Sequence, residues 1–318
     1  MSATLLSVVV PAFNEDAVID HFHQRLTTAL ATIDSIACEL LYIDDGSRDG
    51  TFAKLQAIAE SDARVRVLRL SRNFGHQIAI TCGIDHAIGD AVVIIDADLQ
   101  DPPEVIPSMV SAWRAGADVA YGQRKTRAGE SAFKRWTATA FYRFLNALSD
   151  VEVPMDTGDF RLMSRRAVDA LRQLREESRY MRGLVAWVGF TQVAVPYDRD
   201  ARAAGSTHYS LRQMISLAKN GVAGFSDRPL RLATNLGGVT SMVAFLLGIY
   251  VVLSKVLHPE QSTPGFAALA VLVLFLGGLQ LLSIGLVGEY LGRVFRESKQ
   301  RPLYFVMDDI GAAERREH

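Results

Sequence analysis

Two aspartates, Asp96 and Asp98, follow the apolar segment 92–95 and are separated by a single residue. If this segment is a β-strand, its side chains alternate between two faces, so both carboxylates project to the same side, with Gln100 following them. Carboxylate and amide oxygens are hard ligands that suit Mg²⁺ or Mn²⁺, and such a cation also coordinates a diphosphate. A plain turn is the alternative, because Asp101-Pro102-Pro103 has turn chemistry in its own right.

Two more polar segments come directly after predicted strands. The first is Pro11-Ala-Phe-Asn-Glu15, and the second is Asp44-Asp-Gly-Ser-Arg-Asp-Gly-Thr51. In the second segment the glycines permit unusual φ angles and a polar side chain can cap the following helix, so a purely structural turn is one interpretation. A functional interpretation is that an aspartate here accepts hydrogen bonds from the edge of a nucleobase.

These polar segments require a scaffold of alternating strands and helices. The apolar patterns predict strands over 6–10, 39–43, 65–70 and 91–95, with helices over 16–33, 51–61 and 78–87. Such alternation favours βαβ units, a parallel sheet and flanking helices. In such sheets ligands bind beyond the carboxyl ends of the strands, which is where each polar segment falls.

Bulk properties narrow the class of protein. The chain has 318 residues, a formal net charge of −1 and a sequence pI near 6.7, which gives no support to nucleic-acid binding through bulk charge. Its two cysteines, Cys38 and Cys82, are too few and too far apart for a zinc-knuckle pattern, and they fit a reduced compartment. No signal peptide is expected, because the first residues lead into a strand without a basic leader.

The last third of the chain contains two long apolar segments, 232–257 and 266–291. Each has about the length of roughly 20 residues that a helix needs to cross a bilayer. Buried core helices are the alternative, but two consecutive apolar runs of this length exceed what a globular core normally holds. We therefore expect two transmembrane helices.

Basic residues flank these segments and predict their orientation. Arg228 and Arg231 precede the first segment, and the second is followed by Arg293, Arg296, Lys299 and Arg301. The positive-inside rule then places both ends of the chain in the cytoplasm. We expect a cytoplasmic catalytic domain over 1–230, a transmembrane hairpin over 231–294, and a cytoplasmic tail over 295–318 with a short strand at 303–307.

Two segments of the expected catalytic domain have a pattern typical of membrane-surface helices. Residues 131–148 mix basic side chains with Phe, Trp and Tyr at helical spacing, and 211–225 is a second candidate. Basic aromatic amphipathic helices bind the cytoplasmic face of a bilayer. Packing of these helices on the sheet is the alternative.

Taken in order along the chain, these motifs resemble those of family 2 glycosyltransferases with the GT-A fold. More narrowly, the chain resembles polyprenyl-phosphate sugar transferases, which include dolichol-phosphate mannose synthases, bactoprenol glucosyltransferases and undecaprenyl-phosphate formamido-arabinose transferases. The matching motifs include Ser71-Arg-Asn-Phe-Gly75, Asp96-Ala-Asp-Leu-Gln-Asp-Pro-Pro-Glu104 and Thr157-Gly-Asp-Phe-Arg-Leu162, together with both polar segments above and the apolar hairpin. The resemblance covers nearly the whole chain.

The resemblance implies a fold, an activity and a location. The fold would be an α/β GT-A (Rossmann-like) domain with a mostly parallel sheet flanked by helices, followed by two transmembrane helices. The activity would be inverting, Mg²⁺- or Mn²⁺-dependent transfer of a sugar from a nucleotide-sugar, most consistently a UDP-sugar, to undecaprenyl or another polyprenyl phosphate. The location would be the bacterial inner membrane, with membrane lipid as a neighbour and no nucleic-acid partner.

The resemblance also implies roles for particular residues. The divalent cation would be held by Asp96, Asp98 and Gln100. The nucleotide-sugar would be held by Pro11, Asn14, Glu15, Asp44, Asp45, Asp96 and Arg124, with either Asp44 or Asp45 on the base. The catalytic residues would be Asp98, Asp159 and Arg202, and the acceptor phosphate would be held by Arg135, Arg161, Arg202 and His208.

Several of these roles have structural alternatives. A lone arginine such as Arg135 is often a solvated surface residue, and Asp159, which follows a glycine, can simply cap a turn. Relatives often carry lysine where this chain has His208. Histidine is a weaker, pH-dependent phosphate partner with an ordinary pKa of about 6.5, and it can equally be structural.

Two other functions are compatible with a membrane protein of this family or fold. A processive polysaccharide synthase is disfavoured because two spans are too few for a translocation channel and no Gln-x-x-Arg-Trp motif occurs. A membrane-anchored, non-catalytic nucleotide-sugar scaffold is the rival from another class.

Glu289 and Arg293 are spaced for an i,i+4 ion pair, and the glycine pairs 237–238 and 277–278 permit close helix packing and a homo-oligomer.

Overall fold

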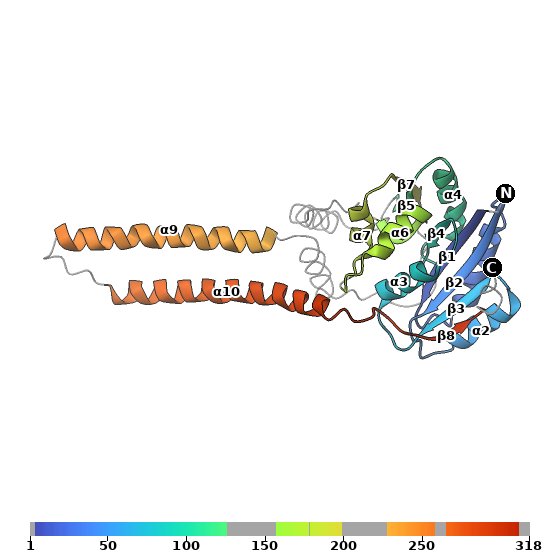
Figure 1. Cartoon of the computed structure of the whole chain (residues 1–318), viewed down its shortest axis with the longest axis horizontal. Helices are drawn as coiled ribbons and strands as arrows, with labels where there is room; N and C mark the ends of the chain where they lie inside the picture. The colour runs from blue at the N-terminus through green and yellow to red at the C-terminus, as the bar shows by residue number, and fades with distance from the viewer. Residues whose placement is uncertain (1–3, 126–156, 178, 199–227, 258–264, 312–318) are drawn as a thin grey trace.

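The computed structural model describes residues 4–125, 157–177, 179–198, 228–257 and 265–311. An α/β part built on one eight-stranded sheet lies at one end, and two long helices project from it side by side (Figure 1). The predicted segments 131–148 and 211–225, and the predicted site residues Arg135, Arg202 and His208, lie outside the described residues.

The strands and helices of the described residues alternate over the first half of the chain. The strands are β1 (Thr4–Ala12), β2 (Ile36–Asp44), β3 (Val65–Leu70), β4 (Ala91–Ile94), β5 (Val119–Arg124), β6 (Thr157–Ser164), β7 (Gln192–Tyr197) and β8 (Val306–Ile310). The helices are α1 (Ile19–Leu30), α2 (Thr51–Ser61), α3 (His76–His86), the 3₁₀ turn η1 (Pro103–Val105), α4 (Ile106–Arg114), α6 (Arg165–Gln173), α7 (Met181–Val188), α9 (Arg228–Leu257) and α10 (Phe266–Ser298). The predicted alternation up to β4 is confirmed.

The sheet is mixed: its centre is parallel as predicted, and antiparallel pairing occurs where β6 and β8 join it. The strand order is β7-β5-β6-β4-β1-β2-β3-β8, and only the β4-β1-β2-β3 core and the β5–β7 pair are parallel. Strand β6 comes later in the chain than β5, yet it lies between β4 and β5 and pairs antiparallel with both. Alternation along the chain cannot reveal a strand that is inserted in this way.

Side chains of the central strands alternate between two hydrophobic cores. Val8 and Val10 of β1 face one core, which also contains apolar residues of α1, α2 and α4. Val9 faces the other core, which contains residues of α3, α6 and α7. Because strand side chains have a period of two, a β-strand buried on both faces reads as the continuous apolar run seen in β1.

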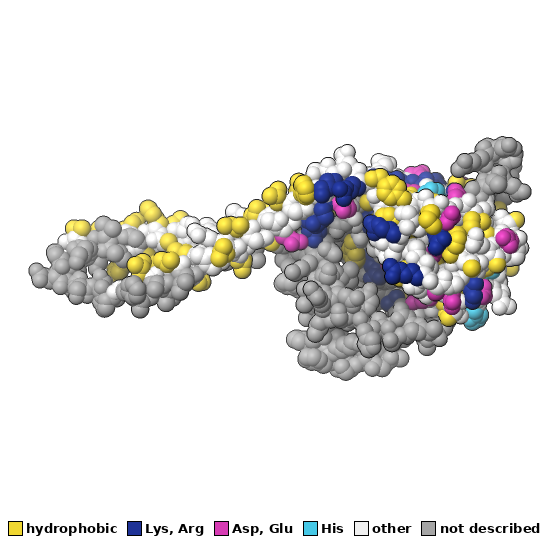
Figure 2. Space-filling view, turned by 90° about the horizontal axis from the view of Figure 1, so that it is seen from below, with side chains coloured by type: hydrophobic (Ala, Val, Ile, Leu, Met, Phe, Trp, Pro, Cys, Tyr) yellow, Lys and Arg dark blue, Asp and Glu magenta, His cyan; other side chains and the backbone are white. Residues whose placement is uncertain are grey.

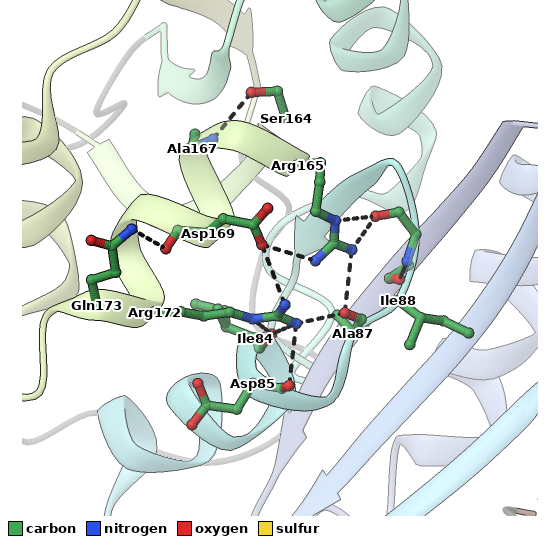
Figure 3. A network of polar contacts seen from close by, with 12 residues as sticks. Ile84, Asp85, Ala87, Ile88, Ser164, Arg165, Ala167, Asp169, Arg172 and Gln173 are labelled. Carbon is green, nitrogen blue, oxygen red and sulfur yellow. Dashed lines mark hydrogen bonds and ion pairs between the residues drawn. The ribbon is translucent and has the colours of Figure 1, made fainter. Parts of the chain in front are cut away.

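Helix α3 is fixed to the sheet and to α6, and this matters because its first turn reaches the site described below. A Cβ atom on Gly83 would lie 2.1 Å from Val9 Cγ1, so only glycine allows α3 to pack this closely on β1. At the other end of α3, Arg172 of α6 donates hydrogen bonds to the backbone oxygens of Ile84 and Ala87, each at 2.6 Å (Figure 3). Carbonyls at a helix C-terminus lack intrahelical partners, so these arginine contacts stabilise the end of α3.

The long helices expose apolar side chains along their length. In α10, the segment Phe275–Ser298 has a mean hydropathy of 1.3, is not buried within the structure, and is long and apolar enough to cross a membrane. Among the described residues no other helix meets both conditions, and α9 contains the shorter apolar stretch Ala233–Leu247. The predicted Glu289–Arg293 pair is present, with Arg293 Nε 4.0 Å from Glu289 Oε1.

The C-terminal strand returns to the sheet of its own chain. It spans Val306–Ile310 rather than the predicted 303–307, and it pairs antiparallel with β3 at the edge of the sheet. Arg66 of β3 forms a two-bond ion pair with Asp309, at 2.9 and 2.8 Å. The apolar pattern of 303–307 does not reveal this shift, because the strand bounds depend on pairing with the distant β3.

Candidate active site

A cavity of about 390 Å³ lies at the carboxyl ends of the parallel core strands. It is lined by Pro11, Ala12, Phe13, Glu15, Asp45, Asn73, Gly75, His76, Ala79, Asp96, Ala97 and Asp98. These residues come from the end of β1 and from the segments that follow β1, β2, β3 and β4, which are far apart in sequence. The prediction that the polar segments meet at this edge of the sheet is therefore confirmed.

Asp96 and Asp98 line this cavity together, but the reason differs from the predicted one. Strand β4 ends at Ile94 and the chain then turns, with Leu99 in the left-handed region at φ +61°. Strand alternation therefore does not place the two carboxylates, and the turn does. The turn is therefore present and both carboxylates line one cavity, while metal binding by them stays a prediction.

The donor set of this cavity fits a hard divalent cation. Asp96 Oδ1 is buried and accepts no hydrogen bond, and burial together with neighbouring carboxylates raises the pKa of Asp96 to about 6 although His76 opposes the shift. Glu15, Asp45 and Asp98 add further carboxylates to the same cavity. Within the described part of the chain, no group of three or more His, Cys, Asp or Glu side chains is arranged to hold a metal ion. A cation here would therefore need oxygen ligands from a bound phosphate or from water.

Gln100, the predicted third ligand, is placed differently from the two aspartates. Its side chain is buried and it is not among the residues that line the cavity. Its backbone N–H donates to Asp98 Oδ1 at 3.1 Å. Gln100 thus orients Asp98 through its backbone, and its side chain as a metal ligand stays a prediction.

The structure separates the roles of Asp44 and Asp45. Asp45 lines the cavity, and its two carboxylate oxygens accept the backbone N–H groups of Phe74 and Gly75 at 2.7 and 2.9 Å. Asp44 is fully buried, with Oδ2 3.4 Å from Arg69 Nε and Oδ1 accepting the backbone N–H of Ser47. Of the two aspartates, only Asp45 lines the cavity.

The loops after β1 and β2 are joined by hydrogen bonds. Asn14 accepts the backbone N–H of Arg48 at 2.9 Å through Oδ1, and its own N–H donates to Ser47 Oγ at 3.0 Å. Glu15 N–H donates to Thr51 Oγ1 at 2.8 Å. Pro11 and Glu15 line the cavity, whereas Asn14, with φ +56°, connects the two loops.

Asp159 is the centre of a buried charge cluster beside the cavity. Arg182 Nε donates to its Oδ1 at 3.1 Å, and Gln77 Nε2 donates to its Oδ2 at 3.0 Å. Burial alone would raise the pKa of Asp159, but Arg182, His76 and Arg161 hold it well below the usual range. Asp159 is therefore an ionised, fixed carboxylate and more than the cap of a turn.

His76, which the sequence analysis did not single out, connects the two acidic groups. Its Nε2 lies 3.4 Å from Asp96 Oδ1 and 3.6 Å from Asp159 Oδ2. Burial lowers the pKa of His76, but the two carboxylates outweigh this and raise it to about 9. The sequence feature that could have indicated His76 is its position directly after the motif that ends at Gly75. Arg182, in α7, had no comparable motif.

Two predicted phosphate-binding arginines are engaged with the protein. Arg161 is buried and donates to the backbone oxygen of Gly158 at 2.9 Å, and burial lowers its pKa to about 10 although Asp159 opposes the shift. Arg124 lies 3.8 Å from Asp101 Oδ1, which also accepts the hydroxyl of Tyr197. Neither arginine is among the residues that line the cavity. Their ligand contacts stay predictions.

A parallel four-strand core that ends in an acidic cavity and is extended by further strands has the architecture of the GT-A glycosyltransferases. The chain belongs to glycosyl transferase family 2, whose model matches residues 7–172, and residues 228–294 match the GtrB C-terminal hairpin. The expectation of a glycosyltransferase of this family is confirmed.

Relatives match over nearly the full length of the chain. An uncharacterized glycosyltransferase of Bacillus subtilis, YkcC, is 45% identical, covering 98% of this chain and 95% of the relative. A prophage bactoprenol glucosyl transferase homolog of Escherichia coli is 40% identical, covering 95% and 98%. The bactoprenol glucosyl transferase of Shigella phage SfV is 39% identical, covering 96% and 98%.

Proposed function

We propose that this glycosyltransferase moves one sugar from a nucleotide-sugar, most consistently a UDP-sugar, to a polyprenyl phosphate such as undecaprenyl phosphate. The observation that carries the proposal is the shared cavity in which Asp45 lies with Asp96 and Asp98. The names of the bactoprenol glucosyl transferase relatives support a polyprenyl-phosphate acceptor. The donor sugar is the part of the proposal that the transfer assay below identifies.

The donor would occupy the cavity with its nucleotide toward β1 and β2. Asp45 would contact the base, because it faces the cavity while Asp44 is paired with Arg69. Pro11 and Glu15 would contact the nucleoside, and Asn14 would act through the loop it holds. Asp96 and Arg124 are proposed for the phosphates and the sugar.

The diphosphate would be held with Mg²⁺ or Mn²⁺ bound by Asp96 and Asp98, with Gln100 supporting Asp98. When bound, the cation would neutralise negative charge on the departing nucleoside diphosphate. Asp96 Oδ1 supports this assignment, because it is buried, accepts no hydrogen bond and lies 3.4 Å from His76, and a further ligand would stabilise a buried carboxylate oxygen.

The acceptor needs no strong general base. A lipid monophosphate is anionic at neutral pH, so its oxygen attacks the anomeric carbon directly. In one in-line displacement, the bond from that carbon to the phosphate oxygen forms, and the bond to the diphosphate oxygen breaks. The nucleoside diphosphate leaves with the electron pair, and the configuration inverts.

The protein must then hold two phosphate-bearing substrates together. Asp159, fixed by Arg182 and Gln77, is proposed to orient sugar hydroxyls or the acceptor at the reaction centre. Guanidinium forks suit the acceptor phosphate. The arginines proposed for it are Arg135, Arg161 and Arg202, with His208 as a further partner.

We also propose that α9 and α10 form a transmembrane hairpin in the bacterial inner membrane, with the α/β part and both termini in the cytoplasm. The match to the GtrB C-terminal hairpin and the exposed apolar surface of α10 support this arrangement. Segments 131–148 and 211–225 are proposed to lie at the membrane surface. Open space beside Gly237 and Gly277 is compatible with helix packing in a homo-oligomer.

A radiolabelled transfer assay tests the function. Purified protein would be given undecaprenyl phosphate, Mg²⁺ or Mn²⁺, and each of a panel of UDP- and GDP-sugars. We expect label in the lipid phase with one donor and its loss on addition of EDTA. Nucleotide binding without transfer from any donor would favour the non-catalytic scaffold, and growth of a polymer would favour a processive synthase.

A further inference from the structure

A second cavity, of about 650 Å³, lies between the end of α10 and the α/β part. It is lined by Asp85, Arg175, Glu177, Arg296, Glu297, Gln300, Arg301, Pro302, Leu303 and Tyr304. None of these residues lines the donor cavity. Figure 2 shows basic and acidic side chains close together where the long helices meet the α/β part.

One wall of this second cavity is internally paired. Arg175 Nη1 lies 2.7 Å from Asp85 Oδ2, and the hydroxyl of Tyr304 donates to the same carboxylate oxygen at 3.0 Å. Asp85 belongs to α3, which is itself fixed to α6. This wall is therefore rigid, and its charges neutralise each other.

The remaining charges of the cavity are not paired with one another. Arg296 and Arg301 are cationic, and Glu177 and Glu297 are anionic. Within the described part of the chain, no ion pair joins either arginine to either glutamate, although Glu297 Oε1 accepts the backbone N–H of Glu177 at 2.9 Å. Two cations and two anions that share a cavity without pairing are complementary to a ligand that carries both charges.

The position of the cavity relative to α10 indicates where such a ligand comes from. Val287 and Leu291 are 52% and 63% exposed, and the arginines Arg293 and Arg296 follow within the next turn and a half of the helix. Apolar exposed side chains that give way to arginine mark the depth at which a membrane helix enters the headgroup layer. The cavity opens at that depth, beyond the apolar part of α10.

We propose that this cavity binds the phosphoethanolamine headgroup of a zwitterionic phospholipid, with its phosphate on Arg296 and Arg301 and its ammonium on Glu177 and Glu297. This inference rests on the membrane placement of α10 in the proposed function. The ammonium donates hydrogen bonds to the carboxylates, which the trimethylammonium of phosphatidylcholine cannot do. Phosphatidylglycerol and a polyprenyl phosphate have no cationic group for the glutamates.

The test is competitive lipid binding to the full-length protein, measured by native mass spectrometry in detergent with equimolar phosphatidylethanolamine, phosphatidylglycerol and phosphatidylcholine of one acyl composition. Two variants separate the two charges, namely Arg301→Gln and Glu297→Gln. Lys299→Gln is the matched control, because Lys299 lies between them in sequence and stacks on Phe295 instead of lining the cavity. Retained nucleotide binding shows that each variant is folded.

For the wild type and the control we expect phosphatidylethanolamine to be preferred at least about fivefold over each other lipid. Arg301→Gln should weaken all three lipids, whereas Glu297→Gln should weaken phosphatidylethanolamine most and so reduce its preference over both other lipids. Equal binding of all lipids, a preference for phosphatidylglycerol, or variants that behave like the control would overturn the proposal. Lipid preference and sugar transfer are measured separately, so failure of one does not imply failure of the other.

Discussion

Arg182 Nε donates a hydrogen bond to Asp159 Oδ1 at 3.1 Å, so α7 holds the carboxylate at the proposed reaction centre. Asp159 is 5% exposed and Arg182 is 30% exposed in their side chains. A buried carboxylate keeps its charge only where cations and donors compensate for lost water. The geometry of Asp159 therefore depends on a residue more than twenty positions away in sequence.

Arg182→Gln should keep the fold and impair the site. Asp159 retains Gln77 and His76 as partners, so we expect a loss of about 1 to 3 kcal/mol in the free energy of unfolding and a fall of roughly tenfold to a hundredfold in kcat. Thermal unfolding and the transfer assay measure the two effects. Arg25→Gln is the control, because it breaks an ion pair with Glu104 whose two residues do not line the cavity, and it should cost at most about 1 kcal/mol with unchanged kcat. Equal effects in both variants would contradict the assignment.

Removal of the divalent cation should weaken UDP binding, and this effect should depend on Asp98. Calorimetry of UDP binding is expected to show affinity at least about tenfold higher with Mn²⁺ than with EDTA in the wild type. Asp98→Asn should lose this difference while its melting temperature stays the same or rises, because one of several clustered negative charges is removed. Asp169→Asn, on the exposed face of α6, should behave as wild type. Metal-enhanced UDP binding that survives Asp98→Asn would remove Asp98 from the metal site.

The elements that position the site could be predicted from sequence because each follows from local pattern. Apolar runs, turn residues and helical periodicity are encoded within a few positions, so the first four strands and three helices were found. The insertion of β6 between β4 and β5 and the pairing of β8 with β3 depend on contacts between distant segments. No local pattern carries that information.

The site residues also differ in whether a local pattern or a contact between distant segments reveals them. Asp45, Asp96 and Asp98 could be predicted because motifs contain them and strand ends gather them. The role of His76 could not be predicted, because its ring lies between Asp96 and Asp159, which the fold brings together from different strands. Whether Asp44 or Asp45 faces the cavity could not be predicted, because β2 ends at Asp44 and strand alternation does not continue past that residue.

The contact between α6 and α3 should be needed for site geometry. Arg172 donates to carbonyls at the end of α3 (Figure 3). The first turn of the same helix carries His76 and Gln77. Arg172→Met keeps the apolar stem but removes these donors, so we expect a loss of about 1 to 3 kcal/mol in unfolding free energy and a lower kcat. Gln173→Ala, at an exposed position of α6, should change neither. A stable Arg172→Met protein with full activity would show that α3 is positioned by the sheet alone.

His23 should make stability depend on pH. Burial lowers its pKa although Asp62 opposes the shift, and its Nδ1 lies 2.9 Å from the hydroxyl of Tyr42. The unfolded chain therefore binds the proton more readily, so this contribution to stability is present above pH 6.5 and is lost as pH falls below it. Thermal unfolding from pH 7.5 to 5 should show a steeper loss for wild type than for His23→Gln. His21→Gln, on the exposed side of α1, should follow wild type, and parallel curves for all three would exclude His23 as the cause.

Substitution of Asp45 should mainly weaken nucleotide binding, whereas substitution of the adjacent Asp44 should mainly lower stability. Asp45→Asn keeps one acceptor oxygen for the backbone N–H groups of Phe74 and Gly75 but loses the charge that faces the cavity, so UDP affinity should fall at least about tenfold. Asp44→Asn leaves the cavity lining intact and removes the buried charge beside Arg69, so it should lower the unfolding free energy by about 1 to 3 kcal/mol with little change in UDP affinity once folded. Calorimetric UDP titration and thermal unfolding of both variants give the comparison. If Asp44→Asn weakens UDP binding more than Asp45→Asn does, the base contact belongs to Asp44, and the donor must enter deeper between β2 and β3 than the cavity indicates.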